Sequence, residues 1–176
     1  MRAWVFCLAA TAMMLFSAPA SAQSTPPGVQ PLYTGQHGAW QIGCARGVAD
    51  QQAFCNLAQG GRYQGGQMPL ILGVHLQRDG EYVFLHFEPG FKKDSDITFL
   101  TDKKEAGELK QVDGKTLRIL PELSKTHIKQ FTAGNVLLVQ FVPNGETDKK
   151  IARFDLAGFT ASMNDARTQL KAALGK

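Results

Sequence analysis

Two cysteines, Cys44 and Cys55, constrain the fold of this chain more than any other feature of its sequence. Cys44 ends the run Trp40-Gln41-Ile42-Gly43-Cys44, and Cys55 opens a second run, Cys55-Asn56-Leu57-Ala58-Gln59. Apolar residues at every second position indicate strands with one buried face. The pattern predicts two neighbouring strands beside Trp40, each carrying one cysteine.

The first 22 residues have the layout of a secretory signal peptide. Arg2 precedes an apolar run from Ala3 to Phe16, and small residues continue to Ala22. We expect cleavage before Gln23, which removes Cys7 with the leader. The alternative is an uncleaved membrane anchor, but the apolar run is short of the ~20 residues that a spanning helix needs. The prediction is therefore a periplasmic or secreted protein with no transmembrane segment after cleavage.

The chain that remains divides into a short terminus and one domain. Residues 23–32 are rich in Ser, Thr and Pro and are predicted to be disordered. Residues 33–176 are enough for a single hydrophobic core and are predicted to form a single domain.

In an oxidising compartment, Cys44 and Cys55 are expected to pair. A reactive catalytic thiol would need a nearby base and no partner, and a zinc site would need about four ligands, whereas only two cysteines remain. We predict a structural disulfide and no cofactor.

The charge pattern does not indicate a nucleic-acid partner. The formal net charge is +4 at pH 7, and many of the lysines fall in scattered pairs such as Lys92-Lys93 and Lys149-Lys150. A nucleic-acid binder needs a dense basic stripe. The lysines are interpreted as solvated surface charge.

A hairpin is predicted around Asp79-Gly80, a typical two-residue connection between the alternating segments 70–78 and 81–88. Arg78 is placed opposite Glu81, since opposite charges across strands attract. This register pairs apolar residues on one face: Leu76 with Val83, Val74 with Leu85, and Leu72 with Phe87. The other face is mixed and carries Gly73, His75, Gln77, Tyr82, Phe84, His86 and Glu88.

The remaining segments complete a mainly β chain. Segment 97–101 reads as a strand, and Asp113-Gly114 predicts a second hairpin between segments 108–112 and 115–120. Residues 60–66 are glycine-rich and predict a flexible loop, without the ending of a phosphate loop. Segments 136–142 and 151–156 have the composition of core strands.

Two helices are predicted. Pro121 suits the first turn of a short helix whose apolar face carries Leu123, His127, Ile128 and Phe131. The closing helix would be capped by Thr160 or Ser162, with Asp165 completing a weak capping box. Its stripe is Met163, Ala166, Leu170, Ala173 and Leu174. The fold class is an antiparallel β-sandwich or partly open barrel, with a short internal helix and a C-terminal helix.

Two segments resemble a known family. Gly38-Ala39-Trp40-Gln41-Ile42-Gly43-Cys44 with Cys55-Asn56-Leu57-Ala58-Gln59, and later Leu156-Ala157-Gly158-Phe159-Thr160-Ala161-Ser162-Met163, are similar to the opening and closing motifs of the invasion-associated locus B family. Many members carry a second cysteine pair in the middle strands, which this chain lacks. The resemblance implies a divergent, small, exported β-rich protein of a virulence-associated family, and it supplies no catalytic residues.

Three functions remain open after these observations. The first is non-catalytic binding of an envelope or host protein through the mixed hairpin face, with Tyr82, Phe84, His75 and His86 as the binding residues. The second is a metal-binding protein or enzyme, because diagonal His75 and His86 with Glu88 could share a metal. The third is an inhibitor of an extracytoplasmic enzyme such as a lysozyme. We expect no enzyme activity, since no hydrolase motif is present.

Overall fold

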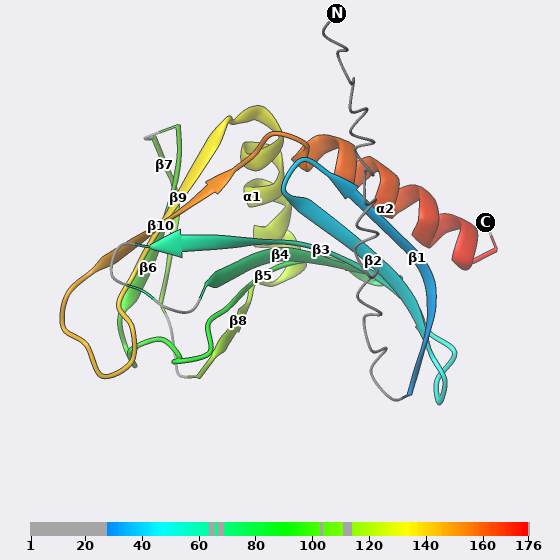
Figure 1. The fold of residues 1–176 in the computed structure, drawn as a ribbon, viewed down its shortest axis with the longest axis horizontal. Coiled ribbons are helices and arrows are strands. Elements are labelled where there is room, and N and C mark those ends of the chain that lie inside the picture. Colours follow the sequence, from blue (N-terminus) through cyan, green and yellow to red (C-terminus); the bar gives the residue numbers. More distant parts are fainter. Residues whose placement is uncertain (1–27, 64–65, 67–68, 103, 111–113, 176) are drawn as a thin grey trace, which may run out of the picture.

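The computed structural model describes residues 28–175 apart from 64–65, 67–68, 103 and 111–113 (Figure 1). The predicted leader and its cleavage site lie outside the described residues. Strand β1 (Val29–His37) begins inside the segment predicted to be disordered. The described part of the chain forms ten strands and two helices.

The chain is mainly β, as predicted, and every strand pairing is antiparallel. The strands form a single curled sheet, a half-barrel, so the partly open barrel is the form that the fold takes. The other elements are β2 (Trp40–Gly47), β3 (Ala53–Tyr63), β4 (Leu70–Gln77), β5 (Gly80–His86), β6 (Asp96–Thr101), β7 (Lys104–Lys110), β8 (Thr116–Arg118), α1 (Pro121–Ala133), β9 (Val136–Phe141), β10 (Lys150–Asp155) and α2 (Phe159–Ala173).

Strand β3 joins the two parts of the sheet. One of its edges pairs with β4, and the other pairs first with β2 and then, at Arg62 and Tyr63, with β10. The order along the main path is β7-β6-β9-β10-β3-β4-β5-β8, and β1 extends the branch through β2.

The prediction of a loop over residues 60–66 is wrong for residues 60–63, which belong to β3. Gly61 lies against the ring of Phe154, and a Cβ atom on Gly61 would lie 2.5 Å from Phe154 Cζ. The glycine therefore leaves room for an aromatic ring on the neighbouring strand and does not signal a flexible loop.

The β4–β5 hairpin exists, but its predicted register is wrong by two residues. Gln77 pairs with Gly80 and Leu76 with Glu81, so Arg78 does not face Glu81 across the strands. A shift of two residues keeps each side chain on its predicted face. The apolar face is accordingly buried as expected, with Leu72, Val74, Leu76, Val83, Leu85 and Phe87 at 0–1% exposure.

The second predicted hairpin is wrong, although its turn lies partly outside the described residues. Strand β7 pairs with β6, whereas β8 pairs with β5, at opposite ends of the sheet path. Helix α1 follows β8 and packs against both β5 and β7. The helix thus lies against strands near both ends of the sheet path (Figure 1).

Helix α1 begins at Pro121 as predicted, and three of the four residues predicted for its apolar face are buried. Leu123 is 51% exposed, and Ser124 is buried in its place together with His127, Ile128 and Phe131. The Ser124 hydroxyl donates to the Ile119 carbonyl and accepts from the Val83 amide. Both hydrogen bonds satisfy the buried hydroxyl, which makes serine tolerable at this position.

Helix α2 lacks the predicted side-chain cap. It begins at Phe159, and its N-cap is Gly158 with φ of 86°, a left-handed conformation that favours glycine. The predicted stripe is buried through Met163, Ala166 and Leu170, with Ala173 and Leu174 partly buried at the core edge. Asp165, predicted to belong to the cap, instead contacts strand β1.

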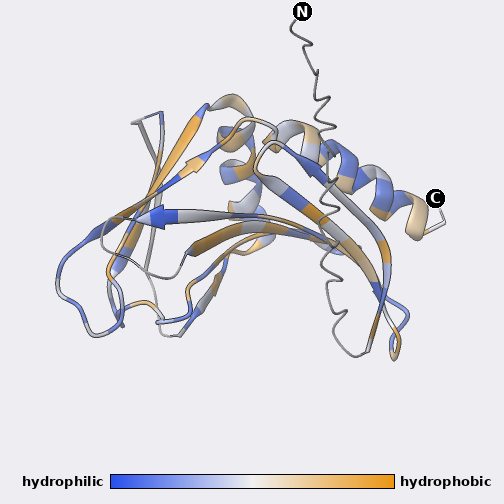
Figure 2. Cartoon of the chain, in the orientation of Figure 1, coloured by the Kyte–Doolittle hydropathy of each residue, from blue (hydrophilic) through white to orange (hydrophobic). Residues whose placement is uncertain are grey.

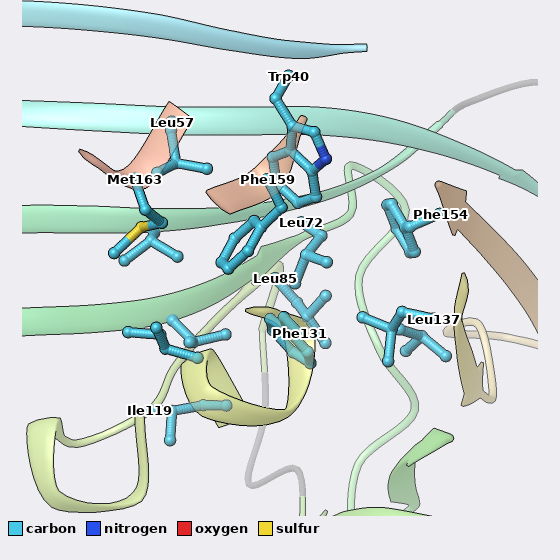
Figure 3. Packing of buried hydrophobic residues seen from close by; sticks show 14 of the residues in the cluster. Trp40, Leu57, Leu72, Leu85, Ile119, Phe131, Leu137, Phe154, Phe159 and Met163 are labelled. Atoms are coloured by element: carbon cyan, nitrogen blue, oxygen red, sulfur yellow. The ribbon is translucent and has the colours of Figure 1, made fainter. Parts of the chain in front are cut away.

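The core lies between the sheet and the two helices (Figure 3). Trp40 is fully buried, packs edge-on against Phe159 with ring centroids 4.9 Å apart, and donates its indole N–H to the Asp155 carbonyl at 2.9 Å. Figure 2 shows apolar residues concentrated along strands such as β4 and β9, and a largely hydrophilic α2 surface. The predicted disulfide is confirmed: Cys44 and Cys55 are direct partners in the β2–β3 pairing.

Candidate binding face

The outward side of β3, β4, β5 and β8 forms a surface that we call the open face. It carries Phe54, Asn56, Gly73, His75, Tyr82, Phe84, His86 and Arg118. Buried side chains of both helices join the core on the opposite side of the sheet. Tyr82 and Phe84 therefore do not lie under α2, and both are half-buried on the outward side.

Tyr82 is fixed at the centre of the open face by two neighbours. Its hydroxyl donates to Asp79 Oδ2 at 2.9 Å, and the Arg118 guanidinium lies 3.7 Å from its ring centroid. The hydrogen bond from Tyr82 holds the pKa of Asp79 below its ordinary value. A cation over an aromatic ring is a stabilising contact, so the ring and the guanidinium form one preorganised unit.

Phe84 lies flat on the open face because its cross-strand partner is Gly73. A Cβ atom on Gly73 would overlap the Phe84 ring, so the aromatic ring occupies the space above the glycine. The ring covers the backbone of β4 and leaves its outer surface available for contact.

His75 is held between two amide side chains. Its Nδ1 lies 2.6 Å from Asn56 Oδ1, and its Nε2 lies 2.9 Å from Gln77 Oε1. The Phe54 ring is stacked beside it, with centroids 5.5 Å apart. Burial lowers the pKa of His75 below 6.5, and this effect outweighs the hydrogen bond to Gln77 and the charge of Asp79.

The lowered pKa of His75 predicts a pH dependence of stability. Because the unfolded chain binds the proton more readily, the free energy of unfolding should decrease as the pH falls through the window just below 6.5. The loss should stop once His75 is also protonated in the folded protein. Urea unfolding across this window, with His75→Gln as the control that lacks the titration, measures the effect. An NMR titration midpoint for His75 at or above 6.5 would contradict it.

The metal-site geometry predicted for His75 and His86 is wrong. His75 pairs with Tyr82 and His86 with Ile71, so the pair Gly73 and Phe84 separates the two histidines. His86 instead contacts Thr116 at 2.8 Å and Glu88 at 3.5 Å. Lys115 also binds Glu88 and lowers the pKa of that carboxyl. Within the described residues, no group of three His, Cys, Asp or Glu side chains could hold a metal ion.

A polar cluster between β1 and α2 escaped the sequence analysis. Tyr33 donates to Asp165 Oδ2 at 2.7 Å, and His37 Nε2 lies 3.1 Å from the same oxygen. The hydrogen bond from Tyr33, followed by that from His37, holds the pKa of Asp165 below its ordinary value. Asp165 is 132 positions from Tyr33 and 128 from His37 in the chain, and no local motif signals such a contact. They tie the first described strand to the last helix.

Comparisons with known proteins supply no relative: no family model, no curated protein and no solved structure matches this chain. Its kinship with the invasion-associated locus B family stays a prediction from the two motifs. Among the described residues, no helix combines the length and the apolar character needed to cross a membrane.

Proposed function

We propose that this protein is an exported, non-catalytic binding protein of the cell envelope or the host interface, related to invasion-associated locus B proteins. It would bind a protein partner through the open face. One observation carries the proposal: a sheet face that neither described helix covers presents Tyr82, Phe84 and Arg118 in fixed positions. Tyrosine and arginine are enriched at the energetic centres of protein interfaces, and rigid side chains lose little entropy on binding.

The alternatives make different demands on the same surface. A metal-binding protein or enzyme would need convergent ligands or a reactive pair, and the register separates His75 from His86. An inhibitor of a lysozyme or another extracytoplasmic enzyme would also bind through a face or loop, so it is a special case of the proposal. Inhibition assays with purified lysozymes distinguish that case from binding without inhibition.

Capture experiments test the proposed function. The purified protein is immobilised and exposed to envelope extract and to host-cell membrane extract. A partner bound through the open face should bind the Tyr82→Ser variant about 30-fold more weakly, as expected for loss of an interface hot spot. Leu123→Ser removes an exposed apolar residue of α1, away from the face, and should retain the partner. Equal capture by both variants would refute the proposed face.

A further inference from the structure

Two arginines stand directly opposite each other at one end of the same sheet surface. Arg62 of β3 is the register partner of Arg153 of β10, and both side chains are exposed. Arg62 lies on the same side of β3 as Asn56, so the pair continues the open face onto β10. Like charges directly opposite each other across antiparallel strands are destabilising. The pair is therefore a feature that folding alone disfavours.

Within the described residues, neither arginine has an acidic partner. The cross-strand neighbour of Arg153 on β9 is Leu138, and Ile151, two residues before Arg153, is also uncharged. Asp155 is the nearest acid along the same side of β10, and its Oδ1 already accepts the Ala157 amide at 2.9 Å. Among the described residues, neither guanidinium therefore forms an ion pair.

Other charged groups of the molecule are used differently. On the side that carries the helices, Arg167 makes two hydrogen bonds to Glu81 at 2.7 and 2.8 Å, and Arg46 donates to the Ala173 carbonyl at 2.6 Å. Acids near the open face are offset by cations, since Glu88 binds Lys115 and the charge of Arg118 acts on the Asp79 carboxylate. The free charge on this surface is consequently positive.

The surroundings of the pair distinguish between classes of acidic partner. A membrane surface is recognised by clusters of about four to eight basic residues or by protruding apolar side chains. Here two arginines stand on a sheet surface where Phe84 lies flat, and Ile151 is the exposed large apolar residue beside them. A nucleic acid requires a longer basic stripe. Carboxylates on a protein match two separate guanidinium groups, each of which can bind bidentately.

From this we infer that the Arg62–Arg153 pair receives carboxylate side chains of an acidic protein segment. The inference rests on the proposed function and specifies the chemistry of the partner. An extended segment presents every second side chain on one side, so glutamate at alternate positions would face the sheet. Binding would relieve the repulsion between the arginines, which gives the acidic partner an advantage that a neutral one lacks.

The probe is a short fluorescein-labelled peptide with glutamate at alternate positions, and its control has glutamine instead. Fluorescence anisotropy with the full protein should detect the glutamate peptide, with affinity that falls as salt rises. The double variant Arg62→Gln/Arg153→Gln should bind at least about tenfold more weakly, the loss expected from one charge-assisted hydrogen bond. Arg78→Gln removes an exposed arginine from the β4–β5 turn and should bind like the parent protein.

A second readout does not depend on any ligand. Arg153→Gln should raise the melting temperature by about 1–3 °C, because it removes the repulsion between paired like charges. A lower melting temperature would show that the arginines stabilise the fold and would overturn the inference.

Three further results would overturn it: no binding of the glutamate peptide, equal binding by the double variant, or binding of phosphatidylglycerol vesicles that the double variant loses. Other outcomes distinguish failure of this inference from failure of the proposed function. Capture of a partner that depends on Tyr82 but not on Arg62 and Arg153 would refute only this inference. Peptide binding without any captured partner would refute only the proposed function.

Discussion

Replacement of Trp40 by alanine is expected to lower the free energy of unfolding by about 3–5 kcal/mol, the usual cost of truncating a large buried aromatic residue. Trp40 is fully buried, and its edge contacts Phe159 of α2. Its removal would leave a cavity between the sheet and the helix. It would also leave the Asp155 carbonyl without the indole donor. Urea denaturation followed by circular dichroism measures the change.

Two matched variants separate packing from hydrogen bonding. Trp40→Phe keeps most of the ring but loses the indole N–H, so it should cost about 1–3 kcal/mol for the unsatisfied carbonyl. Leu123→Ala truncates a half-exposed residue of α1 and should stay within about 0.5 kcal/mol of the parent protein. A loss below about 1 kcal/mol for Trp40→Ala would show that Trp40 does not anchor α2.

Loss of the disulfide is expected to have the second largest effect. Cys44 and Cys55 are 11 residues apart and close a short loop between β2 and β3. In the chain-entropy model, such a bridge stabilises the fold by about 2–3 kcal/mol. Cys55→Ser should therefore lower the melting temperature by roughly 5–10 °C, as measured by differential scanning calorimetry.

The wild-type protein provides the control for this substitution. Refolded in the presence of reductant, it should melt close to Cys55→Ser, and the double variant Cys44→Ser/Cys55→Ser should behave in the same way. The open face lies on the side of the sheet opposite the buried disulfide, so binding by the folded variant should be unchanged. Equal melting with and without reductant would contradict a structural role for the bridge.

The sequence predicts well those features that depend on which side of a strand is buried. Leu72, Val74 and Leu76 alternate with Gly73, His75 and Gln77, and burial follows this alternation except at the buried Gly73. The hairpin register could not be predicted in the same way, because a shift of two residues leaves every side chain on its predicted face. Glu81 pairs with Arg167 of α2, far away in the sequence, instead of with Arg78.

Turn signals were less reliable because long-range pairing decides between local alternatives. Asp79 and Gly80 do not adopt the positive φ angles of a type I′ turn, which the Asp-Gly signal assumes. Strand β8 pairs with β5, and β7 with β6, although Asp113-Gly114 favours a hairpin between β7 and β8. A glycine is ambiguous in the same way, because it can mark a flexible loop or a close contact within a strand. Gly61 is the second case, since it makes room for Phe154.

For the candidate site, the sequence predicts which side of the hairpin the residues occupy, but not which residues they contact. Tyr82, Phe84, His75 and His86 share the outward side of the hairpin, as the alternation indicated. The stack of Arg118 on Tyr82 depends on the pairing of β5 with β8, which no local pattern predicts. The same holds for Arg62 and Arg153, which meet only because β10 pairs with the end of β3.

The contact between Trp40 and Phe159 also sets an order for folding during synthesis. Trp40 lies near the start of the described chain, and its cover, α2, is the last of the described elements to be synthesised. Until residues 159–173 have emerged, the apolar inner side of β2 and β3 has no helix to bury it. Such exposed surface makes a nascent chain prone to aggregation. The described fold can therefore be completed only after α2 is available, and a chaperone that shields β2 and β3 would act before that point.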